Sequence, residues 1–309
     1  MVGISPAYAP VEPSATTWVI DPKGKRRRNS AIDIAPSISG IPRRIIRPAV
    51  SVLIQPTSRA LRIVSPRVCR RQVEKEKIGQ ADADAVLERI GVADGTDGAA
   101  GHDIVIEAVF EDEAVKRETW AALTASADAD AIFASNTSSI SITSLATATD
   151  RAPRFIGLHF FSPVPVMGLI EIIRGLETDD ATHDACRAFA EELGKTVIES
   201  RDMPGFLVNR MLGPFINEAV FALMESTGTA TDIDTGAKLG LNHPMGPLEL
   251  SDFIGNDVML NVMDVLHRGF GDPKFRAAPL LRQMVTAGHL GRKSGRGFYR
   301  YDESGKKID

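Results

Sequence analysis

The stretch that decides the fold is residues 102–136, HDIVIEAVFEDEAVKRETWAALTASADADAIFASN. Two short apolar runs, His102–Phe110 and Ala131–Asn136, have the length of buried strands, and the mixed-charge segment Glu113–Ala125 between them has the composition of a helix. A strand, a helix and a second strand at this spacing form a βαβ unit, whose two strands are parallel. The stretch therefore predicts an α/β fold with a largely parallel sheet.

The same alternation extends on both sides of this stretch and then stops near Met203 and Pro204. Further strands are expected at 154–161, 169–173 and 196–199, with helices at 71–90 and 181–193. Beyond the boundary the pattern is helical only, over 206–224, 231–239, 247–270 and 278–287. The sequence thus predicts an α/β domain over residues 71–202 and an all-helical domain over 203–309.

Residues 1–70 differ in composition from the rest of the chain. They hold ten Arg and two Lys but only three acids, and nine of the 18 prolines but three of the 26 glycines. Because proline fixes φ and removes a hydrogen-bond donor, we expect neither a central strand nor a long helix here. The composition predicts an atypical, loosely packed or disordered segment.

Composition also excludes several classes of protein. The two cysteines, Cys69 and Cys186, are too few for a disulfide scaffold, and no apolar run reaches the roughly 18 residues of a membrane span. The remaining 239 residues carry 24 basic and 37 acidic side chains, which argues against nucleic acid as a partner. No metal-ligand spacing is present, so we expect no metal site. The few cysteines and the absence of a signal h-region favour a cytoplasmic protein.

Polar residues at the ends of two predicted strands could carry chemistry. Ser135–Ser139 follows one strand and could bind a ligand or cap a helix. His159 ends another strand and is either a structural histidine or a proton-transfer group. Glu171 lies in the apolar run 169–173, where a carboxylate needs a partner, and both His159 and Arg174 are candidates.

Six sequence blocks together give the chain a family resemblance. They are IVIEAVFEDEAVKRE, ASNTSSISIT, FIGLHFFSPVPVMGLIEII, MPGFLVNRML, LGLNHPMGPLELSDFIG and LGRKSGRGFY. From about residue 71 to residue 302 the chain resembles the short-chain L-3-hydroxyacyl-CoA dehydrogenases, particularly the bacterial 3-hydroxybutyryl-CoA dehydrogenases. The blocks occur in the order and at the spacing of that family, which makes the resemblance more specific than any single motif.

The resemblance implies a Rossmann-type NAD-binding domain followed by a helical domain that forms a homodimer. It implies NAD-dependent oxidation of an acyl-CoA substrate, L-3-hydroxyacyl-CoA, to the 3-ketoacyl-CoA. The family roles fall on catalytic His159 and Glu171, on substrate-binding Ser138 and Asn209, and on cofactor-binding Glu111, Lys116, Ser138, Ser162 and Lys293.

The chain departs from the family pattern at three places. Ser162 stands where the family has Asn, and Gly168 stands where it has Lys. The larger departure is that the first strand, the GxGxMG loop and the ribose-binding acid belong within residues 1–70, and none is present. KGKRRR at 23–28 cannot replace a glycine turn that brings the backbone to a diphosphate.

The segment is about as long as the piece it replaces, which argues against an added transit peptide. Our hypothesis is that residues 1 to about 70 are a frame-shifted reading of the gene start. Two alternatives to the dehydrogenase remain open: a catalytically impaired family member that lacks the NAD loop, and a related dehydrogenase of free hydroxy acids.

Overall fold

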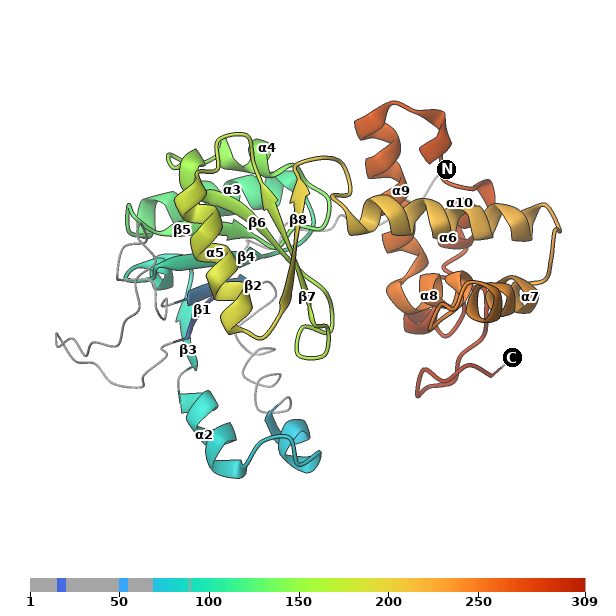
Figure 1. Cartoon of the computed structure of the whole chain (residues 1–309), viewed down its shortest axis with the longest axis horizontal. Helices are drawn as coiled ribbons and strands as arrows, with labels where there is room; N and C mark the ends of the chain where they lie inside the picture. Colours follow the sequence, from blue (N-terminus) through green and yellow to red (C-terminus); the bar gives the residue numbers. More distant parts are fainter. Residues whose placement is uncertain (1–15, 21–49, 55–68, 89, 309) are drawn as a thin grey trace, which may run out of the picture. The chain divides into compact units, whose positions relative to one another are not determined.

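The computed structural model describes residues 16–20, 50–54, 69–88 and 90–308. The chain divides into two compact units (Figure 1), the first made of Met1–Thr137 and Ile142–Ile198, the second of Ser138–Ser141 and Glu199–Asp309. The first unit is an α/β unit and the second is helical. The predicted fold class, an α/β part followed by an all-helical part, is confirmed.

The first unit is built on an eight-stranded sheet with the order β3-β1-β2-β4-β5-β6-β7-β8. Strands β2, β4, β5 and β6 run parallel to one another, whereas β1 is antiparallel to β2 and β3, and β7 is antiparallel to β6. The strands are β1 Thr16–Ile20, β2 Val50–Ile54, β3 Ile90–Asp94, β4 Ile104–Ala108, β5 Ile132–Ser135, β6 Phe155–Phe160, β7 Leu169–Arg174 and β8 Thr196–Arg201.

The expectation that residues 1–70 contain no central strand is wrong. Strand β2 pairs in parallel with β4, with Val50 opposite Ile104, and β1 pairs with β2 on its other side. The prolines at 48 and 56 flank the five-residue run of β2 rather than interrupt it, so every residue of the run keeps its N–H donor. Residues 1–15, 21–49 and 55–68, which include the KGKRRR motif, lie outside the described residues.

The helix predicted over residues 71–90 is interrupted. A first helical segment ends at residue 74, Glu76 adopts a left-handed φ of 54°, and helix α2 (Gln80–Glu88) follows. Ile90–Asp94, at the end of the predicted helix, forms strand β3 instead. Ile90 and Val92 have the β-branched side chains that favour a strand over a helix.

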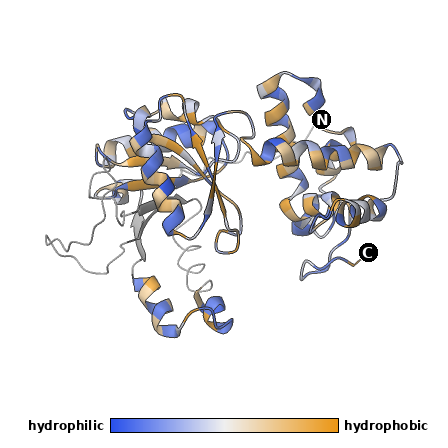
Figure 2. Cartoon of the chain, in the orientation of Figure 1, coloured by the Kyte–Doolittle hydropathy of each residue, from blue (hydrophilic) through white to orange (hydrophobic). Residues whose placement is uncertain are grey.

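Two hydrophobic layers cover the two faces of β5 and β6. On one face Trp120, from helix α3 (Glu113–Ser126), stacks on Phe133 and meets Phe155 edge-on, with ring centroids 4.8 and 4.9 Å apart. On the other face Cys186, from helix α5 (Asp180–Glu192), packs in the same cluster as residues of β6 and β7. Figure 2 shows hydrophobic residues along β6 and β7.

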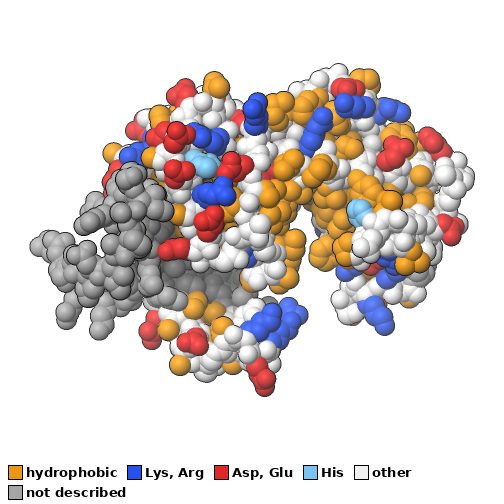
Figure 3. All heavy atoms as spheres, viewed as in Figure 1, with side chains coloured by type: hydrophobic (Ala, Val, Ile, Leu, Met, Phe, Trp, Pro, Cys, Tyr) orange, Lys and Arg blue, Asp and Glu red, His pale blue; other side chains and the backbone are white. Residues whose placement is uncertain are grey.

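Helix α5 presents its other side to solvent. Charged side chains of both signs gather over it (Figure 3), including the Arg187–Glu191 pair one turn apart. Helices α3 and α5 each begin at an aspartate, Asp112 and Asp179, whose side chain accepts a hydrogen bond from a backbone N–H of the first turn. The short helix α4 (Ile142–Ala146) completes the helices of the first unit.

The helices of the second unit are α6 Val208–Met224, α7 Ala230–Thr235, α8 Pro247–Ile254, α9 Asn256–Phe270 and α10 Pro279–Thr286. The helix expected over 247–270 is two helices, because Gly255 has a φ of 113° that ends α8. No described helix of the chain is long and apolar enough to cross a membrane.

A buried aspartate ties the C-terminal segment of the second unit to α8. Asp252 accepts hydrogen bonds from the backbone N–H groups of Phe298 and Tyr299, at 3.0 and 2.9 Å, and from the Tyr301 hydroxyl at 3.0 Å. A Cβ on Gly297 would clash with the Asp252 carboxylate, so only glycine permits this approach. Burial raises the pKa of Asp252 despite these donors.

Candidate active site

The antiparallel pair β6 and β7 places a histidine beside a glutamate. His159 lies directly opposite Glu171 in the register, so their side chains stand on the same face of the sheet. The His159 Nδ1 and Glu171 Oε2 atoms are 3.0 Å apart, and the two side chains are 6% and 0% exposed. Glu171 therefore has the histidine as a partner, while Arg174 pairs with Asp180 at 2.8 Å.

This arrangement selects one tautomer of the neutral imidazole. An ionised carboxylate can only accept hydrogen bonds, so Nδ1 carries the proton and donates a hydrogen bond to Glu171. Nε2 is then the ring nitrogen that can take up a proton. A histidine oriented and charge-stabilised in this way is suited to general acid–base chemistry.

Three consecutive residues at the end of strand β5 bind protein groups of the first unit. Asn136 Oδ1 accepts a hydrogen bond from the Phe160 N–H at 2.8 Å, which joins the end of β5 to the end of β6. Ser135 Oγ donates to Glu107 Oε2 at 2.7 Å, and Thr137 Oγ1 donates to Glu111 Oε1 at 2.6 Å. These side chains organise the carboxyl end of the parallel strands, where ligands bind in open α/β sheets.

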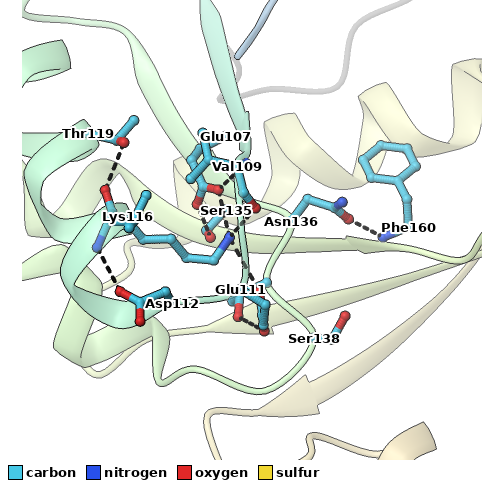
Figure 4. A network of polar contacts seen from close by, with 12 residues as sticks. Glu107, Val109, Glu111, Asp112, Lys116, Thr119, Ser135, Asn136, Ser138 and Phe160 are labelled. Atoms are coloured by element: carbon cyan, nitrogen blue, oxygen red, sulfur yellow. Dashed lines mark hydrogen bonds and ion pairs between the residues drawn. The ribbon is translucent and has the colours of Figure 1, made fainter. Parts of the chain in front are cut away.

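Behind this end of the sheet lies a buried ion pair that the sequence analysis did not identify (Figure 4). Lys116 Nζ is 2.6 Å from Glu107 Oε1 and 3.3 Å from Glu111 Oε2, and the side chains of Lys116 and Glu107 are 1% and 0% exposed. A signal was present, because Glu107 stands inside the apolar run Ile104–Val109 just as Glu171 stands inside its own. The rule that a buried carboxylate needs a partner applies equally to both.

The other predicted site residues lie in separate places. Asn209, on α6, donates its side-chain N–H to the Ser138 carbonyl oxygen at 3.1 Å, and both belong to the second unit. Lys293 forms an ion pair with Asp257, with Nζ 2.7 Å from Oδ2. Ser162 is exposed just after β6, before a cis peptide bond to Pro163.

No metal site accompanies these residues. Among the described residues no group of three or more His, Cys, Asp or Glu side chains is placed to hold a metal ion.

At Gly168, where the family has lysine, an added Cβ would meet no atom within 4 Å. A longer side chain at this position therefore would not disturb the surrounding packing.

Comparison with known proteins agrees with this fold. The NAD-binding domain of 3-hydroxyacyl-CoA dehydrogenase matches residues 55–203, and the C-terminal domain of 3-hydroxyacyl-CoA dehydrogenase matches residues 205–301. The chain belongs to the 3-hydroxyacyl-CoA dehydrogenase family, which consists of oxidoreductases that use NAD. The resemblance stated from the sequence is thereby confirmed.

Named relatives make the comparison more specific. A 3-hydroxybutyryl-CoA dehydrogenase of Bradyrhizobium diazoefficiens is 53% identical over 231 residues, covering 75% of this chain and 79% of the relative. One of Mycobacterium tuberculosis is 38% identical over 280 residues, covering 90% and 96%. The crystal structure of (S)-3-hydroxybutyryl-CoA dehydrogenase from Ralstonia eutropha matches with a TM-score of 0.76 at 49% identity, covering 79% of this chain and 86% of that one.

Proposed function

We propose that this chain oxidises L-3-hydroxybutyryl-CoA reversibly to the 3-ketoacyl-CoA with NAD, and that His159 and Glu171 are its catalytic pair. The observation that carries the proposal is the buried contact of 3.0 Å between His159 and Glu171 on adjacent strands. Relatives named 3-hydroxybutyryl-CoA dehydrogenase are 53% and 49% identical to this chain, which supports a substrate with a short acyl chain.

In this mechanism His159 Nε2 removes the proton of the C3 hydroxyl group. Glu171 orients the imidazole and stabilises the imidazolium that forms, which is the usual contribution of a carboxylate behind a catalytic histidine. Bound NAD supplies the hydride acceptor. The proposal assigns binding of the hydroxyl or thioester oxygen to Ser138 and Asn209, and alignment of substrates provides much of the rate of a two-substrate reaction.

The residues present fit the nicotinamide half of NAD. Glu111 has a carboxylate that is 30% exposed and anchored by Lys116 and Thr137, and such a group can accept hydrogen bonds from ribose hydroxyls. Ser162 and Lys293 supply further polar groups for the cofactor, whereas the buried Lys116 acts on it by anchoring Glu111. For the diphosphate, the sequence contains no GxGxxG turn.

We also propose that the protein is a cytoplasmic homodimer formed through its second unit. Large apolar side chains of that unit remain exposed, among them Leu239, Leu241 and Phe253 at 82%, 62% and 49%. Large apolar side chains left exposed on one unit support a subunit interface there. The two free cysteines, both buried, agree with a reducing compartment. Light scattering of the purified chain measures the oligomeric state.

A second candidate is a family member that keeps the fold and holds NAD weakly. The absence of the glycine turn favours it, because no other segment of the sequence has that motif. Titration of the expressed chain with NADH separates the two candidates. Saturable binding below millimolar NADH supports the dehydrogenase, and no binding at millimolar NADH supports the impaired form.

The substrate class is tested by NADH oxidation with two matched ketones. The proposal expects turnover of acetoacetyl-CoA and little turnover of free acetoacetate. Preference for free acetoacetate would instead assign the chain to the dehydrogenases of free hydroxy acids.

A further inference from the structure

The ammonium group of Lys116 has no exposed surface from which to contact a ligand. Its Nζ is 2.6 Å from Glu107 Oε1, 3.3 Å from the Val109 carbonyl oxygen and 3.3 Å from Glu111 Oε2. A lysine ammonium has three N–H donors, and three protein acceptors surround this one. Lys116 can therefore act on a ligand only through the groups that it binds.

Of the two carboxylates on Lys116, only that of Glu111 reaches the surface. Glu107 is fully buried, and its Oε1 and Oε2 also accept hydrogen bonds from the Val109 N–H and the Ser135 hydroxyl, both at 2.7 Å. The side chain of Glu111 is 30% exposed and receives the Thr137 hydroxyl on its other oxygen. Figure 4 shows the chain of contacts from Glu107 through Lys116 to Glu111.

We propose that Glu107 is a positioning residue, which holds Lys116 so that Lys116 fixes the carboxylate of Glu111 for the ribose hydroxyls of the cofactor. The inference rests on the proposed function, because it takes Glu111 as a cofactor contact. The physical reason is neutralisation: a buried ammonium is stable only beside a buried carboxylate, and Glu107 is that carboxylate. Lys116 then supplies the positive charge that orders the partly exposed Glu111 at the end of the sheet.

Variants of Glu107 and Lys116 distinguish a positioning role from a role in stability alone. If the pair only stabilised the fold, the urea midpoint of unfolding and the affinity for NADH would change together. Removing one charge, in Glu107→Gln or Lys116→Met, leaves the other buried without its partner and lowers the urea midpoint of unfolding. Removing both, in the double variant Glu107→Gln/Lys116→Met, restores much of that midpoint because no buried charge is left uncompensated. Affinity for NADH does not recover in the double variant, because Glu111 still lacks Lys116.

The experiment measures NADH affinity by fluorescence titration and unfolding by urea, for the full chain and each variant. We expect the Kd for NADH to rise at least about tenfold in Lys116→Met and in the double variant, the effect of losing one charge-assisted interaction. Glu118→Gln, on the exposed side of the same helix, is the matched control and should change neither quantity. The inference is overturned if the double variant binds NADH as tightly as the unaltered chain.

Glu111→Gln separates failure of this inference from failure of the proposed function. If Glu111→Gln leaves the Kd for NADH unchanged, Glu111 is not a cofactor contact and the proposed site is wrong. If it weakens NADH binding but Lys116→Met does not, only the positioning role is wrong. If the unaltered chain binds no NADH, a crystal structure of Lys116→Met still decides the positioning role, since an unmoved Glu111 carboxylate would refute it.

Discussion

Replacing Glu171 by glutamine tests the catalytic pair directly. Glutamine keeps the size of the side chain and a carbonyl oxygen that can accept from His159 Nδ1, but it removes the negative charge 3.0 Å from the ring. Both side chains are buried, so solvent does not screen the interaction strongly. Removing this charge therefore destabilises mainly the transition state, in which the imidazole of His159 becomes positively charged.

The size of the effect follows from Coulomb's law. Two unit charges about 4 Å apart at an effective dielectric constant of about 20 interact by about 4 kcal/mol, and a hydrogen bond to a charged group contributes about 1.5–3 kcal/mol. Since the amide keeps part of the hydrogen bond, we expect a loss of about 2–4 kcal/mol. At 1.36 kcal/mol for each factor of ten, turnover should fall about 30- to 900-fold.

The assay is steady-state reduction of acetoacetyl-CoA at saturating NADH. Arg174→Gln, which removes a partly exposed side chain from the same strand, is the control and should keep its turnover. Because the two residues act as one unit, the double variant His159→Gln/Glu171→Gln should be no slower than His159→Gln alone. Turnover of Glu171→Gln within about threefold of the unaltered chain would refute the pairing as a catalytic device.

Four further predictions follow from single features. His159→Gln should lower turnover at least about 100-fold with little change in KM, measured in the same assay. Gly297→Ala should destabilise the second unit by about 1–3 kcal/mol in urea, because its Cβ meets the Asp252 carboxylate, whereas Gly236→Ala, with nothing within 4 Å, should not. Burial raises the pKa of Cys186 from 9.0 to about 12, so above pH 9 the folded thiol stays protonated while the unfolded thiol ionises. The free energy of unfolding should therefore fall as the pH rises above about 9, and Cys186→Ala should lose this pH dependence. Resequencing the gene start should reveal a shifted frame before codon 70, and an intact frame would refute that hypothesis.

Much of the site could be predicted from the sequence because its chemistry is local. An apolar run that contains Glu171, and a histidine at the end of the preceding strand, already indicate a buried pair. The choice between His159 and Arg174 as partner could not be made, because it depends on the register of β6 and β7, which one sequence does not specify. Glu107 was missed for a different reason: its partner lies on a helix nine residues later, and a lysine in a mixed-charge helix has the pattern of an exposed residue.

The fold shows the same division. Strands β4 to β7 follow from their apolar runs, whereas β1 and β2 lie in a segment whose proline content predicted no central strand. The composition of a 70-residue segment does not exclude a strand, because β1 and β2 each need only five residues free of proline. Likewise the break at Gly255 depends on a φ of 113° that the helical pattern across it does not reveal.

The contacts of Asp252 have a consequence for synthesis of the protein. Three of its donors, on Phe298, Tyr299 and Tyr301, come 46 to 49 residues later in the chain. A ribosome adds about 5–20 residues each second, so Asp252 waits roughly 2–10 s for these partners. During that time the C-terminal segment that packs against α8 has not been synthesised, and the Asp252 carboxylate lacks these three donors. The helical unit therefore completes its core, which includes Tyr299 and Tyr301, only after the ribosome has released residue 301.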